Sequence, residues 1–198
     1  AGVPPDYFSA DGQLWGNPVY NNAAMKRNGY RWWKSRLRFA LSRYDYLRID
    51  HFRGLDRYWA IPNGEKAING EWEKADGFDV LKNIPNNRLI AEDLGVIDDG
   101  VINLMKRLDL RGMKVLLFAF NGDKNNPYLP ENVGEKSVSY IGTHDNDTAV
   151  GYINKLGKDE KKRFIKAVAG YAGVTPSSLD SAKKIADALL KILYSLES

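Results

Sequence analysis

Three predicted β-strands of the chain end in acidic side chains, and these are the residues best suited to chemistry. The acidic residues at the strand ends are Asp50, Glu92, Asp93 and Asp145. The chain has only two histidines, His51 and His144, and each adjoins one of these aspartates. Because the carboxyl ends of parallel strands form the active-site face of α/β proteins, we expect these side chains to line one site.

Two carboxylates on neighbouring strands suit the cleavage of a glycosidic bond. One attacks the anomeric carbon while the other protonates the departing oxygen, and a retaining enzyme holds them roughly 5 Å apart. Asp50 beside Arg48 should stay ionised, which suits a nucleophile. Glu92, near that anion and in a partly dry cleft, should have a raised pKa, which suits an acid.

A metal-dependent hydrolase is an alternative reading of the same residues. Its ligands would be His51, His144, Asp50 and Asp145. Two neighbouring arginines, Arg48 and Arg53, make this a poor cation site.

A structural role is the plainest alternative for any one of these residues. An aspartate after a strand often caps the next helix, and a histidine beside it can bond a backbone carbonyl. Glu92 does not fit this role, because Asp98 or Asp99 is better placed to begin the following helix.

Strands alternate with helices along the chain. Strands are predicted at 44–50, 88–95, 113–120 and 137–147, and helices at 30–44, near 78–84, after Asp98 or Asp99, and twice beyond 157. Such alternation predicts an α/β fold with a parallel sheet. Four strands do not close an eight-stranded barrel, so the chain forms either a small open sheet or part of a barrel.

Alternation of side chains along the strand at 44–50 predicts how the charges are placed. Arg48 and Asp50 share one face, and Leu47 and Ile49 share the other. With the apolar pair turned toward helices, the charged pair faces the site.

The remaining segments are predicted from turn and capping residues. Residues 1–22 read as a loop and 57–77 as an irregular insertion. Of the two helices that finish the chain, one should end at Gly173, and the other should open with a Thr175 cap and Pro176 in its first turn.

Composition narrows the class of protein. The absence of cysteine excludes disulfides and a thiol nucleophile and fits a reducing, cytoplasmic location. The net charge of +4 is small, and the "KDEKKR" run at 158–163 mixes both signs, so we expect no nucleic-acid partner. No apolar run is long enough for a transmembrane helix, and the first residues do not resemble a signal peptide.

Five motifs, in order and with matching spacing, resemble the 4-α-glucanotransferases known as amylomaltases or disproportionating enzymes. They are "GVPPDYFSADGQLWGNPVY" (2–20), "RIDHFRG" (48–54), "AEDLGVI" (91–97), "GMKVLLFAF" (112–120) and "GTHDND" (142–147). The resemblance implies a parallel β/α (TIM) barrel of the α-amylase clan, of which 1–198 supplies about strands 4 to 7 as a partial catalytic domain. One departure is Asn22, where the family usually has tryptophan.

The resemblance also implies roles for individual residues. Asp50 is the nucleophile, Glu92 the acid/base, and Asp145 the third carboxylate, which binds sugar hydroxyls. The substrate-binding residues implied or suggested are Arg48, His51, His144, Asp93 and, in a loop covering the cleft (1–22), Asp6, Tyr7, Phe8 and Trp15.

The implied activity is transfer of α-1,4-glucan segments by a retaining double displacement, with no metal or organic cofactor. The implied partners are α-1,4-glucans such as maltooligosaccharides and chains from starch or glycogen. A hydrolase of the same clan and a non-catalytic glucan-binding fragment are the alternatives. Because the outer strands would lack neighbours, we expect the chain alone to be inactive or weakly active and to self-associate through exposed sheet edges.

Overall fold

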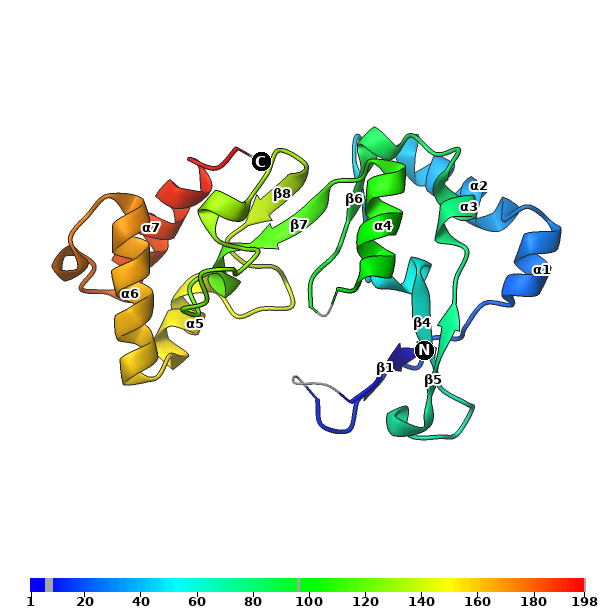
Figure 1. The fold of residues 1–198 in the computed structure, drawn as a ribbon, viewed down its shortest axis with the longest axis horizontal. Helices are drawn as coiled ribbons and strands as arrows, with labels where there is room; N and C mark the ends of the chain where they lie inside the picture. The colour runs from blue at the N-terminus through cyan, green and yellow to red at the C-terminus, as the bar shows by residue number, and fades with distance from the viewer. Residues whose placement is uncertain (6–8, 96, 198) are drawn as a thin grey trace. The chain divides into compact units, whose positions relative to one another are not determined.

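The computed structural model describes residues 1–5, 9–95 and 97–197 (Figure 1). The chain forms two compact units, 1–112 and 113–198, and each is described by itself.

A pair of parallel strands lies at the centre of the first unit. Strand β3 (Leu47–Ile49) pairs with β6 (Leu89–Ala91) in a register that places Ile49 opposite Ala91. Ile90 extends the parallel arrangement through a bridge to Arg111. Leu89 and Ala91 are fully buried, as expected for a strand covered by helices. The predicted parallel pairing of these two strands is confirmed.

Three helices contribute buried side chains to the core of the first unit: α2 (Arg31–Leu41), α3 (Gly77–Leu81) and α4 (Asp99–Leu108). Helix α1 (Asn22–Arg27) has no fully buried residue and packs Met25 against this core. Helix α4 begins as predicted, because the Asp98 carboxylate accepts hydrogen bonds from the backbone N–H groups of Gly100 and Val101. Helix α1 was not predicted; the Asn22 amide connects it to strand β5 (Glu71–Lys74) by donating to the Lys74 carbonyl at 3.5 Å.

An antiparallel sheet corrects the prediction for two segments that read as irregular. It runs in the order β2 (Gln13–Leu14), β1 (Gly2–Val3), β4 (Arg57–Ala60) and β5 (Glu71–Lys74). Two of its strands are only two residues long and are defined by pairing with distant segments, so they leave no local pattern. Strands β4 and β5 pair Trp59 with Trp72, whose rings lie 5.2 Å apart.

Gly77, at the start of α3, allows this helix to approach the turn that ends in Leu55. A Cβ at position 77 would lie 2.3 Å from the Leu55 carbonyl oxygen. We expect Gly77→Ala to lower the free energy of unfolding by about 1–3 kcal/mol, because backbone must move to accommodate it. Urea unfolding measures the change. Gly170→Ala is the control, since nothing lies near that helical position and alanine should stabilise the helix slightly. An unchanged free energy of unfolding in Gly77→Ala would contradict the close contact between Gly77 and Leu55.

In the second unit, β7 (Gly112–Val115) is hydrogen-bonded to β8 (Ser137–Tyr140). The strand predicted over 113–120 is shorter than expected. After Val115 the chain turns into a 3-10 helix, Leu116–Phe118. Leu116 and Leu117 are still buried, and a short run of buried apolar residues looks like a strand in the sequence even where it forms a helical turn.

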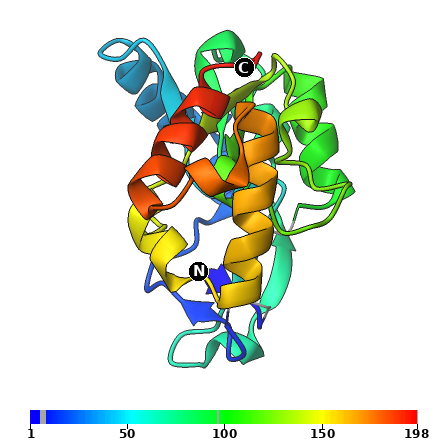
Figure 2. The same ribbon diagram turned by 90° about the vertical axis from the view of Figure 1, so that its left-hand side faces the viewer.

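Three α-helices follow in the second unit: α5 (Ala149–Lys155), α6 (Lys158–Ala172) and α7 (Ala182–Leu193). Helices α6 and α7 lie side by side (Figure 2). As predicted, α6 ends at Gly173, which has a left-handed conformation. Helix α5 was missed, and α7 begins later than predicted, because Ser181 caps it whereas Pro176 starts a separate 3-10 turn.

The predicted α/β class is therefore observed, although the structure contains antiparallel strand pairs beside the predicted parallel one. The strands within the described residues form three separate sheets and close no barrel. Among the helices of that same part of the chain, none has the length and apolar character needed to cross a membrane.

Candidate active site

Asp50 and Glu92 lie side by side because they follow two paired strands in register. Strand β3 ends at Ile49 opposite Ala91, the last residue of β6. Beyond the strands, the Glu92 N–H donates to the Ile49 carbonyl at 3.0 Å, and the Phe52 N–H donates to the Glu92 carbonyl at 3.1 Å. Backbone hydrogen bonds thus fix both carboxylates at one end of the parallel pair, where neighbouring strands are about 4.8 Å apart.

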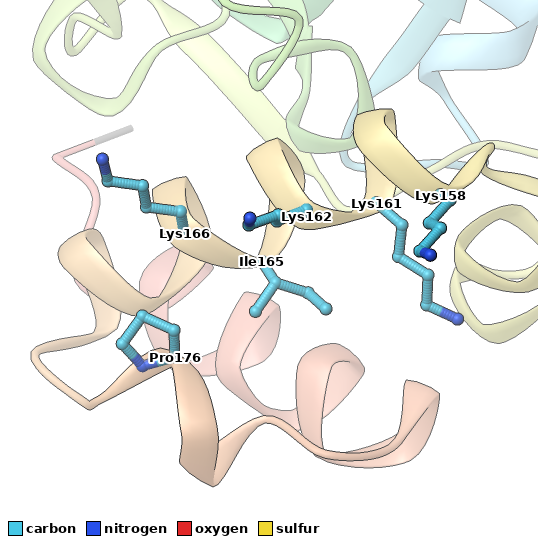
Figure 3. Close-up of a pocket in the computed structure, with 6 residues that line it drawn as sticks. All are labelled: Lys158, Lys161, Lys162, Ile165, Lys166 and Pro176. Atoms are coloured by element: carbon cyan, nitrogen blue, oxygen red, sulfur yellow. The ribbon is translucent and has the colours of Figure 1, made fainter.

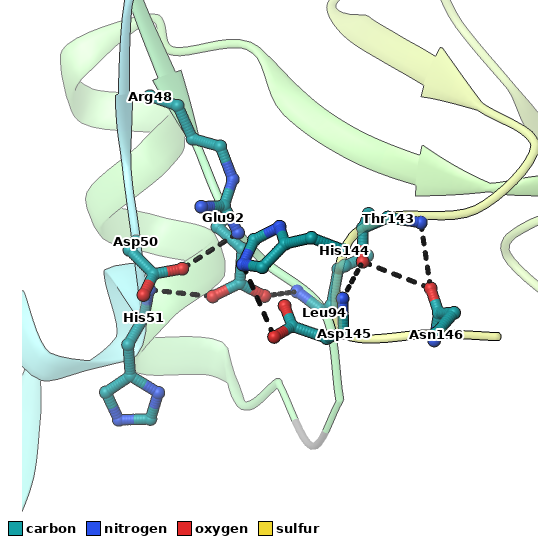
Figure 4. A network of polar contacts seen from close by, with 9 residues as sticks. All are labelled: Arg48, Asp50, His51, Glu92, Leu94, Thr143, His144, Asp145 and Asn146. Atoms are coloured by element: carbon teal, nitrogen blue, oxygen red, sulfur yellow. Dashed lines mark hydrogen bonds and ion pairs between the residues drawn. The ribbon is translucent and has the colours of Figure 1, made fainter.

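Arg48 and Asp50 form an ion pair on one face of β3. The Arg48 Nη2 atom lies 2.8 Å from Asp50 Oδ1, which confirms that the two side chains share a face (Figure 4). Leu47 and Ile49 pack against the core on the other side. The Asp50 side chain is 73% exposed, so its carboxylate is open to an incoming ligand.

The Glu92 carboxylate is held by two backbone donors. The His51 N–H donates to Oε2 at 2.7 Å, and the Leu94 N–H donates to Oε1 at 3.0 Å (Figure 4). Burial raises the pKa of Glu92, and the negative charge of Asp50 acts in the same direction. The two N–H donors and Arg48 oppose this rise without cancelling it. The predicted direction of the Glu92 pKa shift is therefore found, and a raised pKa suits a carboxyl group that must carry a proton.

His51 joins the two carboxylates through an unusual backbone conformation. Its φ of 45° and ψ of 55° place it in the left-handed region, which few residues other than glycine adopt. Its ring meets the edge of Trp15, with centroids 4.8 Å apart. The His51 Nε2 atom is buried and accepts or donates no hydrogen bond within the described residues. The ring points away from the Asp50 and Glu92 carboxylates (Figure 4).

Burial lowers the pKa of His51, and the charge of Arg53 adds to this effect while Asp50 opposes it. The unfolded chain therefore binds a proton here more readily than the native one. This contribution to the free energy of unfolding is complete above the ordinary histidine pKa of about 6.5 and is lost as the pH falls through the native pKa.

We accordingly expect the stability difference between wild type and His51→Gln to shrink as the pH falls from 7.5 to 5. Urea unfolding at both pH values measures it. His144→Gln is the control, because it makes the same substitution at a side chain that is mostly exposed. If the free energies of unfolding of wild type and His51→Gln had the same pH dependence, His51 would not be a buried, neutral side chain in the native state.

Of the other predicted site residues in the first unit, the structure describes the contacts of Trp15 and Asp93. Trp15 contacts the His51 ring, as noted, and donates from Nε1 to the Gln13 side chain. Asp93 packs closely on Gly112, where a Cβ would lie 2.6 Å from its Oδ2 atom. Asp6, Tyr7 and Phe8 lie outside the described residues.

Asp145 and His144 belong to the second unit and are described within it. They lie in a turn after β8 that is closed by the Asn146 side chain, whose Oδ1 accepts from the Thr143 N–H at 3.0 Å. His144 Nε2 lies 3.4 Å from Asp145 Oδ1 (Figure 4). Both side chains are mostly exposed, so this turn presents an imidazole and a carboxylate together.

A pocket in the second unit contains none of the predicted site residues. Its volume is about 470 Å³, and it is lined by Lys158, Lys161, Lys162, Ile165, Lys166 and Pro176 (Figure 3). The lysine stems form most of its wall, and the ammonium groups point in different directions rather than toward one point (Figure 3). The pocket therefore lacks the converging polar groups of the Asp50 and Glu92 site.

Sequence reasoning missed two features around Glu92. The backbone donors from His51 and Leu94 depend on local conformation, for which the sequence gives no direct sign. The ion pair between Arg53 and Asp98, at 2.7 Å, was also missed, although both residues had been noted separately. In the described part of the chain, no group of three or more acidic or histidine side chains is placed to hold a metal ion.

Comparison with known proteins gives a consistent result. Residues 1–198 match the family model described as 4-alpha-glucanotransferase. The 4-alpha-glucanotransferase of Synechocystis is 48% identical over 172 residues, which are 83% of this chain and 34% of that protein. The chloroplastic/amyloplastic 4-alpha-glucanotransferase of Solanum tuberosum is 47% identical over 171 residues, 84% of this chain and 30% of that protein.

A solved structure is similar over the whole chain. The amylomaltase from Streptococcus agalactiae in complex with acarbose is 35% identical with a TM-score of 0.87, covering 100% of this chain and 39% of that one. The chain thus spans about a third of the length of the curated relatives cited above. Since the family model matches every residue, the chain belongs to the 4-alpha-glucanotransferase family.

Proposed function

We propose that this chain carries the catalytic carboxylates of an enzyme that transfers α-1,4-glucan segments between glucans with retention of configuration. The observation that carries the proposal is the pairing of Asp50 with Glu92 on in-register parallel strands. Asp50 is exposed beside Arg48, and Glu92 is half-buried with a raised pKa. The raised pKa of Glu92 suits a general acid, and the exposed carboxylate of Asp50 suits a nucleophile that must reach the donor sugar.

In the first half-reaction, an Asp50 carboxylate oxygen attacks the anomeric carbon of the donor glucan. The bond from that carbon to the bridging oxygen breaks as the new bond to Asp50 forms, and Glu92 gives its proton to the departing oxygen. The product is a glucosyl ester of Asp50, and the reducing-end fragment leaves with the proton. Arg48 holds the Asp50 carboxylate in position through their 2.8 Å ion pair.

In the second half-reaction, the 4-hydroxyl of an acceptor glucan attacks the same anomeric carbon. Glu92, now ionised, removes the hydroxyl proton as the bond to Asp50 breaks. Both catalytic residues return to their starting protonation states. Binding of a sugar acceptor in place of water is what favours transfer over hydrolysis.

The remaining proposed residues bind substrate. Asp145 binds sugar hydroxyls in the transition state, and His51 and His144 contact the substrate. The exposed side chains of Asp145 and His144 support the assignments of these two residues. Segment 1–22, with Asp6, Tyr7, Phe8 and Trp15, is proposed to cover the glucan; the contact of Trp15 with His51 supports this.

We also propose that β3, β6, β7 and β8 are strands 4 to 7 of a β/α barrel. The parallel register of β3 with β6 and the parallel bridge from Ile90 to Arg111, directly before β7, support this arrangement. The 198-residue chain alone would then expose strand edges and self-associate, which size-exclusion chromatography would detect.

Incubation of maltotriose with the whole protein that carries this chain tests the function. Transfer should yield glucose together with glucans longer than maltotriose, resolved by chromatography. Maltose and glucose without longer products would mean hydrolysis and overturn the proposal. The 198-residue chain, assayed in parallel, should show little or no turnover.

A further inference from the structure

An ion pair connects the two segments that follow the proposed catalytic residues. Arg53 lies three residues after Asp50, in the 3-10 helix Phe52–Leu55, and Asp98 lies six residues after Glu92. Arg53 Nη2 is 2.7 Å from Asp98 Oδ2. The Arg53 side chain is only 14% exposed, so this pair is screened by solvent much less than a surface pair.

Both partners are held in orientation by additional contacts. The second carboxylate oxygen of Asp98 caps α4, accepting from the Gly100 N–H at 3.1 Å and the Val101 N–H at 3.3 Å. The Arg53 guanidinium lies over the Trp72 ring of β5, with its central carbon 4.6 Å from the ring centroid. One geometry of the pair is therefore favoured.

The charge of Asp98 persists at working pH. Burial opposes ionisation of Asp98, but the hydrogen bonds from Arg53 and Val101 and the charges of Arg53 and Arg57 lower its pKa overall. The N-terminus of α4 also packs tightly on this segment, because a Cβ at Gly100 would lie 2.5 Å from Asp56 Oδ2. The contact has little room to adjust.

We propose that the Arg53–Asp98 ion pair is a positioning device that keeps the Glu92 carboxylate seated against its backbone donors. This inference rests on the proposed role of Glu92 as the acid/base. One donor, the His51 N–H, belongs to the segment that Arg53 anchors, and the other, the Leu94 N–H, belongs to the segment that Asp98 anchors. The ion pair joins both segments at their far ends.

Loosening this connection should hydrate Glu92. Burial is the main cause of its raised pKa, with Asp50 raising it and Arg48, the His51 N–H and the Leu94 N–H lowering it. Water entering between the segments would remove part of the burial effect and would also weaken the two N–H donors, whose loss alone would raise the pKa. Because burial is the larger effect, the pKa of Glu92 should fall toward its ordinary value. Glu92 would then lose its proton at lower pH, and the alkaline limb of the activity profile would move with it.

The test compares Arg53→Met, Asp98→Asn and Arg53→Lys in the whole protein. Methionine keeps much of the packing on Trp72 without the charge, and asparagine keeps the capping ability of residue 98. Lysine keeps the charge and should restore part of the effect. Lys82→Met is the matched control, because it removes a 2.7 Å ion pair with Asp79 on the exposed surface.

Two readouts are needed: the carbon-13 NMR titration of the Glu92 carboxyl group and the pH dependence of kcat/KM for maltotriose. We expect Arg53→Met and Asp98→Asn to shift both toward lower pH, and Lys82→Met to shift neither. Reduced thermal stability with an unmoved titration in both variants would overturn the inference. An inactive wild type would refute the proposed function, while the NMR titration would still decide the role of the ion pair.

Discussion

Glu92→Gln is expected to lower kcat for glucan transfer by about 10²–10⁴-fold, the usual contribution of a positioned general acid and base. The amide can neither protonate the departing oxygen nor accept the proton of the acceptor hydroxyl. Its effect on glucan affinity should be small, because the side chain keeps its size. Maltotriose disproportionation measures the first quantity, and calorimetric titration with acarbose, which a related amylomaltase binds, measures the second.

The structure adds a condition to this experiment. Glu92 accepts from two backbone N–H groups, whereas glutamine has one acceptor oxygen, so its NH₂ group must face one of these donors. A moderate loss of thermal stability should therefore accompany the loss of activity. Glu71→Gln, on exposed β5, is the matched control and should change neither quantity. Turnover near the wild-type rate in Glu92→Gln would exclude its acid/base role.

Asp50→Asn is expected to reduce transfer by about 10⁴-fold or more, as loss of a covalent nucleophile does in well-studied hydrolases. The effect on stability should be small, because the side chain is mostly exposed. Mass spectrometry after reaction with a slow-turnover glycosyl fluoride provides a direct measurement. The wild-type peptide that contains residue 50 should carry one sugar, and the Asp50→Asn peptide should carry none.

Asp50→Asn should also change the titration of Glu92. The charge of Asp50 raises the pKa of Glu92, so its removal should lower the pKa of Glu92 in an NMR titration. Asp45→Asn, at an exposed position before β3, is the matched control and should leave labelling and titration unchanged. Labelling of a different residue in the wild type would contradict the assignment of Asp50.

The sequence predicts those parts of the fold that leave a local pattern, such as alternation, a capping residue or a terminal glycine. The strand residues Leu47 and Ile49 show alternation, Asp98 is a capping residue, and Gly173 supplies the left-handed end of α6. The strands of the antiparallel sheet lack such a pattern. Strand β1, for example, exists because Gly2 lies opposite Leu14 on one side and Trp59 on the other, which is a tertiary relation.

For the site, too, the sequence predicted the features that have a local pattern and not those that depend on tertiary structure. Alternation along a strand places Arg48 and Asp50 on one face, and the structure has them in contact. The support of Glu92 was not predictable, because it depends on the direction of an N–H group at His51. The cross-segment pair of Arg53 and Asp98 likewise requires knowledge of where α4 begins relative to the 3-10 helix.

The left-handed conformation of His51 should make selection for stability and selection for activity favour different residues at position 51. A left-handed histidine costs about 1 kcal/mol relative to glycine, yet this conformation is what directs its N–H toward Glu92. A laboratory screen for heat tolerance alone would therefore enrich glycine or asparagine at this position. A screen for turnover would retain the imidazole, so the two libraries should diverge at the residue next to the nucleophile.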